Sequence, residues 1–382
     1  SILSHIELAL SCIIRFRLLP GNDLITYAGG DWDDTLQPAS ETLKENLVSS
    51  WTVALAYQTF RSLDKALAGQ KNCETLSSKF SSLADRLKMA FQRHLIRGGV
   101  IAGFWQAGQA NPYMLHPLDS QTGIHYRLLP MTRSIIAELV NPAQAQNNAE
   151  IIATHLKFPD GVRLMDRPAR YQGGICCLFR RAEQAANVGR EISLQYTHAH
   201  IRYIEAMAKL GYSAEAWESL FSINPILIGH TVPNAGIRQS NLYFSSSDGA
   251  FHDRYEYERS FDLLRTGSIR VNGGWRLYSS GPGIYLRQLI ENILGIRFSK
   301  DGLIIDPQLP RSLDGLRFRY RCFGKIRVFQ YHLSPEYSLC AVTEGKTLSG
   351  LLLRSRYRQG GLLVPIPEFN RCGEQIDIYI PC

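Results

Sequence analysis

The spacing of apolar residues predicts helices over most of the chain. Apolar positions recur at intervals of three and four from residue 41 to 67, and a second such run follows from 76 to 95. Two amphipathic runs joined by a short connection are typical of a helical hairpin. The same spacing predicts further helices at residues 1–19, 131–140, 143–156, 196–210, 214–221 and 284–294.

The pattern changes to alternation near residue 302. Alternating apolar and polar positions predict strands, and they occur at residues 303–307, 316–320, 326–331 and 376–379. Segment 98–105 is predicted as a strand or extended loop, and segments 163–190 and 228–275 as irregular. The predicted fold is mainly α with a C-terminal β domain: antiparallel helix pairs of an α/α toroid over 1–298, then a small antiparallel β domain over 299–382.

Composition places the chain among soluble globular proteins. Its 382 residues, 45% hydrophobic and 20% charged, suffice for one large or two ordinary domains. The apolar patch at residues 6–14 is too short to span a bilayer and lacks the flanks of a signal peptide, so no membrane segment is predicted. Residue 1 is Ser rather than Met, which leads us to expect that the chain is cut from a longer protein.

The net charge of +8 does not predict a nucleic-acid partner, because Lys and Arg are scattered and no basic run with interleaved aromatics occurs. An anionic small substrate fits this charge equally well. The eight cysteines show no CxxC or zinc spacing, and a chain of this size does not need disulfides. Reduced thiols in a cytoplasmic protein are expected.

The segment Gly29-Gly30-Asp31-Trp32-Asp33-Asp34 holds three carboxylates and an indole in six residues, which predicts a site. A flat indole suits the apolar face of a sugar. Crowded carboxylates repel one another, so the pKa of one can rise until it holds a proton near neutral pH, as a general acid must. The alternatives are an acidic loop around a packed Trp and a calcium loop.

Residues 189–200 form a second polar cluster. Glu191 and His198 are seven apart, so on one continuous helix they would lie two turns apart on the same face. Arg190 and His200 lie beside them at a predicted helix start, where exposed amides favour anions. A single His on a helix is more often a core or surface residue, and the spacing lacks an HExxH pattern, so no metal site is predicted.

Two further polar segments have less specific patterns. Residues 238–249 supply amides and hydroxyls that could bind a polyol, although the segment could equally be a polar surface loop. Residues 278–283, rich in Ser and Gly, precede a predicted helix and could hold an oxyanion at its N-terminus. No Walker lysine follows.

Taken in order, these segments resemble motifs of the inverting glycoside phosphorylases of glycoside hydrolase family 94. Residues 30–34 resemble its GDWND segment, 191–199 its E-N-G-x-Q-Y-x-H-A segment, and 273–281 its G-G-x-x-W-x-T-G segment. Residues 295–297 and 305–310 resemble the lead into its C-terminal β domain. The sequences of residues 163–195 and 238–248 resemble those of the 1,2-β-oligoglucan phosphorylases within this family more than those of the cellobiose phosphorylases.

The resemblance implies a role for each matching residue. Asp34 would be the general acid, and Trp32, Glu191 and Gln239 would bind sugar. His198, Ser280 and Gly281 would hold phosphate. The sequence departs from the family at three places: Asp33 replaces Asn, Ile192-Ser193 replaces Asn-Gly, and Ser280 replaces Thr.

The resemblance also implies an architecture and a reaction. The chain would supply an (α/α)6 barrel that is incomplete at its N-terminus, followed by a β-sandwich, and it could be inactive alone. The reaction would be phosphorolysis of β-glucan oligosaccharides to α-glucose 1-phosphate by a single inverting displacement. Phosphate would be the co-substrate, no cofactor is expected, and a homodimer is a further expectation.

Phosphate is already an anionic nucleophile, so one carboxylic acid with a separate anion pocket suffices for phosphorolysis. One rival is an inverting toroid hydrolase with Asp34 as acid and Glu191 as base. A rival of another class is a fragment that binds sugar without turnover. In either enzyme Asp34, Glu191, His198 and Ser280 should converge on one cleft.

Overall fold

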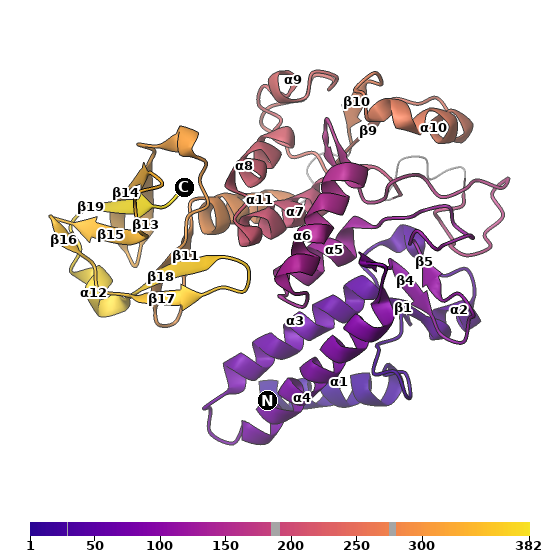
Figure 1. Cartoon of the computed structure of the whole chain (residues 1–382), viewed down its shortest axis with the longest axis horizontal. Helices are drawn as coiled ribbons and strands as arrows, with labels where there is room; N and C mark the ends of the chain where they lie inside the picture. The colour runs from indigo at the N-terminus through magenta and orange to yellow at the C-terminus, as the bar shows by residue number, and fades with distance from the viewer. Residues whose placement is uncertain (29, 185–191, 275–279) are drawn as a thin grey trace. The chain divides into compact units, whose positions relative to one another are not determined.

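The computed structural model describes residues 1–28, 30–184, 192–274 and 280–382, and it confirms a largely helical chain that ends in a β domain (Figure 1). The chain forms two compact units, Ser1–His200 with Pro225–Leu277, and Ile201–Asn224 with Tyr278–Cys382. In this division residues 201–224 group with the C-terminal sheets, and the predicted domain boundary at residue 298 stays a prediction. No helix in the described ranges is long and apolar enough to cross a membrane.

The predicted first helical hairpin is interrupted by a strand. Helix α2 (Glu41–Asn46) ends before β1 (Leu47–Ser49), and α3 (Ser50–Leu67) follows directly. The three residues of β1 are buried and pair with β4 (Phe104–Gln106), so tertiary pairing overrides the helical spacing here. Ser49 also serves as the N-cap of α3 by accepting a hydrogen bond from the amide of Thr52.

The second half of the hairpin forms as predicted. Helix α4 (Glu74–Ala90) continues into a π-helical turn at Phe91–Leu95 and packs along α3 (Figure 1). Segment 98–105 is extended, as predicted. Gly98 and Gly99, with φ of 57° and 80°, turn the chain between β2 (Ile96–Arg97) and β3 (Val100–Ile101). The remaining strand here, β5 (Tyr113–Met114), pairs with β4.

The first unit contains two more helices at the predicted place. Helix α5 (Leu128–Ile136) packs against α6 (Pro142–Ile151), which continues as a π-helical turn to Leu156. Asn141 and Gln144 form a capping box, and Pro142 occupies the first helical position, which explains why the helix begins there. The turn after it joins β6 (Lys157–Phe158) to β7 (Gly161–Val162).

The stretch predicted as a long loop after Leu227 holds regular structure, so that prediction is wrong. It contains α9 (Ile228–Thr231), β9 (Ser246–Gly249), α10 (Arg254–Ser260) and β10 (Val271–Gly273). Strand β9 lies between β10 and β8 (Gln195–Tyr196) in a three-stranded antiparallel sheet. The sequence pattern did not predict β9, because its buried positions are serines and show no alternation of apolar and polar residues. The neighbouring core comprises Phe158, Ile228, Val232, Tyr257, Phe261, Leu264 and Val271.

The second unit begins inside α7 (Thr197–Leu210) and contains α8 (Ser213–Ser222) and α11 (Ser280–Arg287), which continues as a π-helical turn to Ile293. Gly211, with φ of 87°, ends α7 in the left-handed conformation that the sequence predicted. Other helices in the described ranges are α1 (Ile2–Phe16) in the first unit and α12 (Ile366–Asn370) in the second, with short 3₁₀ turns at Asp34–Leu36, Phe261–Leu264 and Arg311–Leu313.

The C-terminal strands form two sheets. One sheet has the order β11-β12-β18-β17 and the other the order β13-β14-β19-β15-β16 (Figure 1). The predicted all-antiparallel pairing is wrong at β14 and β19, which run parallel because the chain between them crosses over through other strands and α12. The strands are β11 (Ile296–Phe298), β12 (Gly302–Ile305), β13 (Arg317–Cys322), β14 (Lys325–Leu333), β15 (Cys340–Thr343), β16 (Lys346–Thr347), β17 (Leu351–Arg354), β18 (Gln359–Pro365) and β19 (Gln375–Ile380).

Candidate active site

Asp31, the first carboxylate of the acidic segment, is fully engaged inside the protein. Its Oδ1 accepts from Arg127 Nη2 at 2.8 Å and from the amide of Asp33 at 2.9 Å. Its Oδ2 accepts from Arg127 Nη1 at 3.1 Å and from the hydroxyl of Ser49. Because the side chain is also completely buried, Asp31 cannot reach a substrate.

Asp33 is also internal, whereas Asp34 faces outward. The side chain of Asp33 is fully buried, accepts the amide of Thr35 at 3.1 Å, and lies 4.0 Å from Arg127 Nη2. The side chain of Asp34 is 61% exposed, and its Oδ2 lies 3.9 Å from Arg181 Nη1. The segment therefore presents one carboxylate to solvent, and it is the one that the family resemblance assigns as the acid.

Trp32 joins the acidic segment to the start of α7. Its half-buried indole meets the ring of Tyr196 edge to face, with centroids 4.9 Å apart, and the ring of His198 with centroids 5.8 Å apart. His198 is the second residue of α7 and is itself half-buried. The structure thus brings together Trp32, beside Asp34, and His198, which the sequence placed in separate clusters.

The irregular stretch after residue 163 borders this site. Residues 35–39 run antiparallel to 178–182, with backbone hydrogen bonds from Ala39 to Leu178, from Arg180 to Gln37 and from Ala182 to Thr35. This pairing fixes the segment that follows Asp34 and explains why Arg181 lies near it.

The two histidines of the second cluster differ in role. His200 is completely buried, its Nδ1 accepts the amide of Val162 at 3.1 Å, and its ring fills the space above Gly161. His200 is therefore part of the core. Residues 192–198 do not form one continuous helix, because β8 precedes α7. Glu191 itself lies outside the described residues.

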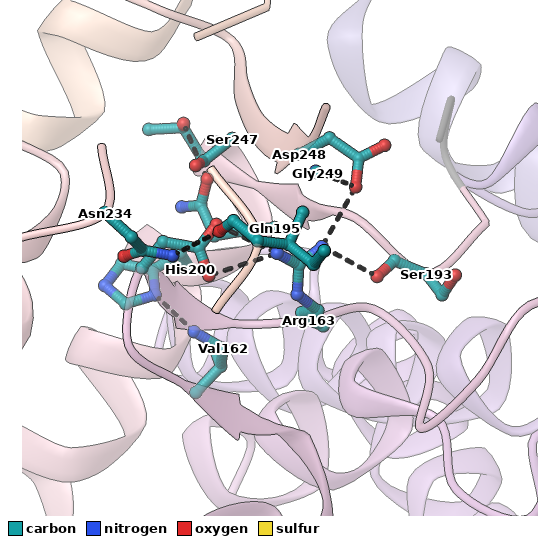
Figure 2. A network of polar contacts seen from close by, with 12 residues as sticks. Val162, Arg163, Ser193, Gln195, His200, Asn234, Ser247, Asp248 and Gly249 are labelled. Atoms are coloured by element: carbon teal, nitrogen blue, oxygen red, sulfur yellow. Dashed lines mark hydrogen bonds and ion pairs between the residues drawn. The ribbon is translucent and has the colours of Figure 1, made fainter. Parts of the chain in front are cut away.

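A buried charge network connects Arg163 to Asp248 of β9 and to Ser193 (Figure 2). The guanidinium of Arg163, which is fully buried, binds both oxygens of Asp160 at 3.1 and 3.0 Å and donates to Asp248 Oδ1 at 3.1 Å. It also donates to the carbonyl of Ser193. Burial lowers the pKa of Arg163, but Asp160 and Asp248 outweigh it and raise the pKa above its ordinary value.

Asp248 is the strongly perturbed carboxyl of this network. Burial raises its pKa to about 6, although Arg163 and the amide of Gly249 act in the opposite direction. The serines before it, 245–247, are buried, and the hydroxyl of Ser247 accepts from Arg238 at 2.9 Å. These hydroxyls are therefore used within the fold rather than displayed on a loop.

The remaining predicted site residues are Gln239, Ser280, Gly281 and Glu191. Gln239 is exposed in the segment before β9, next to the buried Arg238. Ser280 and Gly281 begin α11 in the second unit. The convergence of these residues and Glu191 with Asp34 thus remains a prediction. Within the described ranges no group of three or more His, Cys, Asp or Glu side chains could hold a metal, and all eight cysteines are free thiols.

The C-terminal region matches a family model described as the glycoside phosphorylase C-terminal domain, over residues 295–377. A 1,2-beta-oligoglucan phosphorylase from Listeria innocua is 49% identical over 382 residues, which cover 99% of this chain and 34% of that protein. The chain is related to the glycoside phosphorylases. The resemblance predicted from the motifs, including its 1,2-β-oligoglucan branch, is confirmed.

Two more distant relatives were found. A cellobionic acid phosphorylase from Neurospora crassa is 26% identical over 76% of this chain and 34% of its own length. A cyclic beta-(1,2)-glucan synthase NdvB from Rhizobium meliloti is 24% identical over 79% of this chain and 10% of its own length. The chain thus spans at most 34% of these relatives. A solved glycosidase in complex with glucose aligns at a TM-score of 0.40 and 14% identity, covering 68% of this chain and 56% of that chain, which supports no conclusion about the fold.

Sequence reasoning missed Arg127, Ser49 and Tyr196, which hold the acidic segment in place. Ser49 carries no recognisable signal, whereas Tyr196 stands at the Tyr of the E-N-G-x-Q-Y-x-H-A motif but was given no role. Arg127 does, since it is a single cation directly before the apolar run Leu128-Leu129-Pro130-Met131, where a buried charge requires a partner.

Proposed function

We propose that the protein carrying this chain catalyses phosphorolysis of β-1,2-linked glucan oligosaccharides, releasing α-glucose 1-phosphate and a shortened oligosaccharide. The observation that carries the proposal is the placement of Asp34. It is the exposed carboxylate of its segment, and it directly follows a Trp32–Asp33 pair whose indole contacts His198 at the first turn of α7. The similarity to the Listeria innocua phosphorylase supports the substrate class.

In the proposed mechanism Asp34 is the general acid. It protonates the glycosidic oxygen as the bond to the anomeric carbon breaks, so that the leaving sugar departs as an alcohol. Phosphate attacks the opposite face of the anomeric carbon, and a single displacement inverts its configuration. The indole of Trp32 offers an apolar surface to the sugar whose bond is cleaved.

The phosphate side of the site is assigned to the start of α7. His198 lies in the first turn of this helix, where the positive end of the helix dipole also favours an anion. We further assign Ser280 and Gly281, the first residues of α11, to the phosphate, and Glu191 and Gln239 to the sugar. No cofactor takes part in this scheme.

The proposal extends to the wider architecture. The helices would form part of an (α/α)6 toroid, the two C-terminal sheets a β-sandwich, and residue 298 the boundary between these domains. A homodimer in the cytoplasm completes the proposal.

Product analysis with and without inorganic phosphate tests the function. With β-1,2-glucan oligosaccharides, turnover should require phosphate and give α-glucose 1-phosphate. Release of free glucose at the same rate without phosphate would replace the phosphorylase with an inverting hydrolase. Binding without turnover in the protein carrying this chain would favour the sugar-binding module.

A further inference from the structure

The acidic segment depends on a cation that is distant in sequence. Arg127 lies 96 residues beyond Asp31, at the N-cap of α5, and its side chain is only 1% exposed. Both terminal nitrogens bind the two oxygens of Asp31, at 3.1 and 2.8 Å. The guanidinium also stacks over the ring of Phe104 at 4.8 Å.

The ion pair between Arg127 and Asp31 is buried, so its stability depends on its geometry. Two charges removed from water are tolerated when their geometry is good, and here both terminal nitrogens of Arg127 meet both oxygens of Asp31. Burial lowers the pKa of Arg127, but the carboxylates of Asp31 and Asp33 outweigh it and raise that pKa above its ordinary value. Arg127 therefore stays charged, and the fork geometry of its two contacts dictates where Asp31 lies.

Gly103 leaves room for the side chain of Arg127 because it has no β-carbon. A β-carbon on Gly103 would lie 2.6 Å from Leu115 Cβ and 3.1 Å from Arg127 Cδ. Strand β4, which begins next to this glycine, pairs with β1, whose Ser49 donates to Asp31. Asp31 is thus held by α5 through Arg127 and by the β1–α3 junction through Ser49.

Fixing Asp31 also orients the residues after it. The amide of Asp33 donates to Asp31, and the side chain of Asp33 caps the 3₁₀ turn that Asp34 begins. Asp33 itself is extended, with φ −89° and ψ 93°. With Asp31 and Asp33 buried, Asp34 is left exposed and Trp32 half-buried.

We propose that Arg127 is a positioning residue for the general acid, acting through Asp31, and that Asp31 has no acid or base role of its own. This inference rests on the proposed function of Asp34. A displacement of about 1 Å in a catalytic group can cost roughly 10²-fold in rate. Loss of the fork should therefore lower turnover even where the protein stays folded.

Two variants test this: Arg127→Lys, which keeps the charge but not the fork, and the milder Asp31→Asn. We expect kcat on β-1,2-glucan oligosaccharides with phosphate to fall by about 10²-fold or more, while the KM for phosphate changes little. On a 2,4-dinitrophenyl β-glucoside, whose leaving group needs no proton, the loss should be several times smaller. That dependence on the leaving group separates misplacement of the acid from partial unfolding, which lowers both rates equally.

Arg163→Met is the matched control, since Arg163 is also buried but binds Asp160 and Asp248 rather than the acidic segment. It should lower the melting temperature with the same proportional loss on both substrates. An equal loss on both substrates in the two test variants would overturn the positioning role. Lack of phosphorolysis by the unmodified protein would instead refute the proposed function, so the two failures are distinguishable.

Discussion

The indole of Trp32 meets the imidazole of His198 at 77°, with ring centroids 5.8 Å apart. These residues come from segments that are 166 residues apart (198 − 32 = 166). The contact places the acidic segment beside the first turn of α7, which is the arrangement that a phosphorylase needs if the acid and the anion site serve one bond.

His198 and His200 should respond to substitution in different ways. His198→Gln should raise the KM for phosphate by roughly 10- to 100-fold, because a hydrogen bond to a charged group is worth about 1.5–3 kcal/mol. Its melting temperature should change little. Steady-state kinetics at varied phosphate give the first value and calorimetry the second.

His200→Ala is the paired control. It leaves the buried amide of Val162 without its acceptor and opens a cavity beside Gly161, so we expect a loss of about 2 kcal/mol or more in the free energy of unfolding. A clear fall in the melting temperature of His198→Gln with an unchanged KM for phosphate would instead make His198 a structural residue.

Arg163 should be among the most sensitive positions for stability. Arg163→Met leaves Asp160 and Asp248 without their shared cation, and breaking a buried pair typically costs about 3–5 kcal/mol. Arg180→Met removes an exposed ion pair with Glu41 and should cost about 1 kcal/mol or less. Urea unfolding of both variants measures the difference, and similar values would contradict the network.

Asp248 should make stability depend on pH. Its pKa is about 6 in the folded protein against an ordinary value of 3.8, so between these values the folded state binds more protons than the unfolded state. The free energy of unfolding should therefore fall as pH rises from about 4 to 6 through this group.

The contribution can be isolated by substitution. In Asp248→Asn the fall over this pH range should be smaller than in the unmodified protein, as followed by urea unfolding at several pH values. Parallel pH profiles for the two proteins would show that Asp248 titrates normally in the fold.

Sequence patterns predicted the elements whose signals are local. Helix α6 begins where Asn141, Pro142 and Gln144 indicate, and the acidic segment is visible as a cluster. The strands β1 and β9 were missed because Leu47–Ser49 continues a helical spacing and Ser246–Gly249 lacks apolar residues. In both places pairing with a distant strand decides the structure.

The choice among Asp31, Asp33 and Asp34 also depends on distant contacts. The three carboxylates are equivalent in the sequence, and only the family resemblance favoured Asp34. In the structure Arg127 and Ser49 engage Asp31, while Asp33 is buried as the cap of the following turn. No spacing within the segment encodes these partners.

Asp34 should protonate the leaving group as the glycosidic bond breaks. The most direct test is whether the loss of turnover in Asp34→Asn depends on the leaving group. With β-1,2-glucan oligosaccharides and phosphate, kcat should fall by roughly 10²- to 10⁴-fold, the usual contribution of a positioned general acid. Asp301→Asn, an exposed carboxylate of the β domain, should change nothing. With a 2,4-dinitrophenyl β-glucoside and phosphate, Asp34→Asn should retain most of its turnover, because this leaving group departs without a proton. A loss of equal size on both substrates would contradict the assignment of Asp34 as the acid.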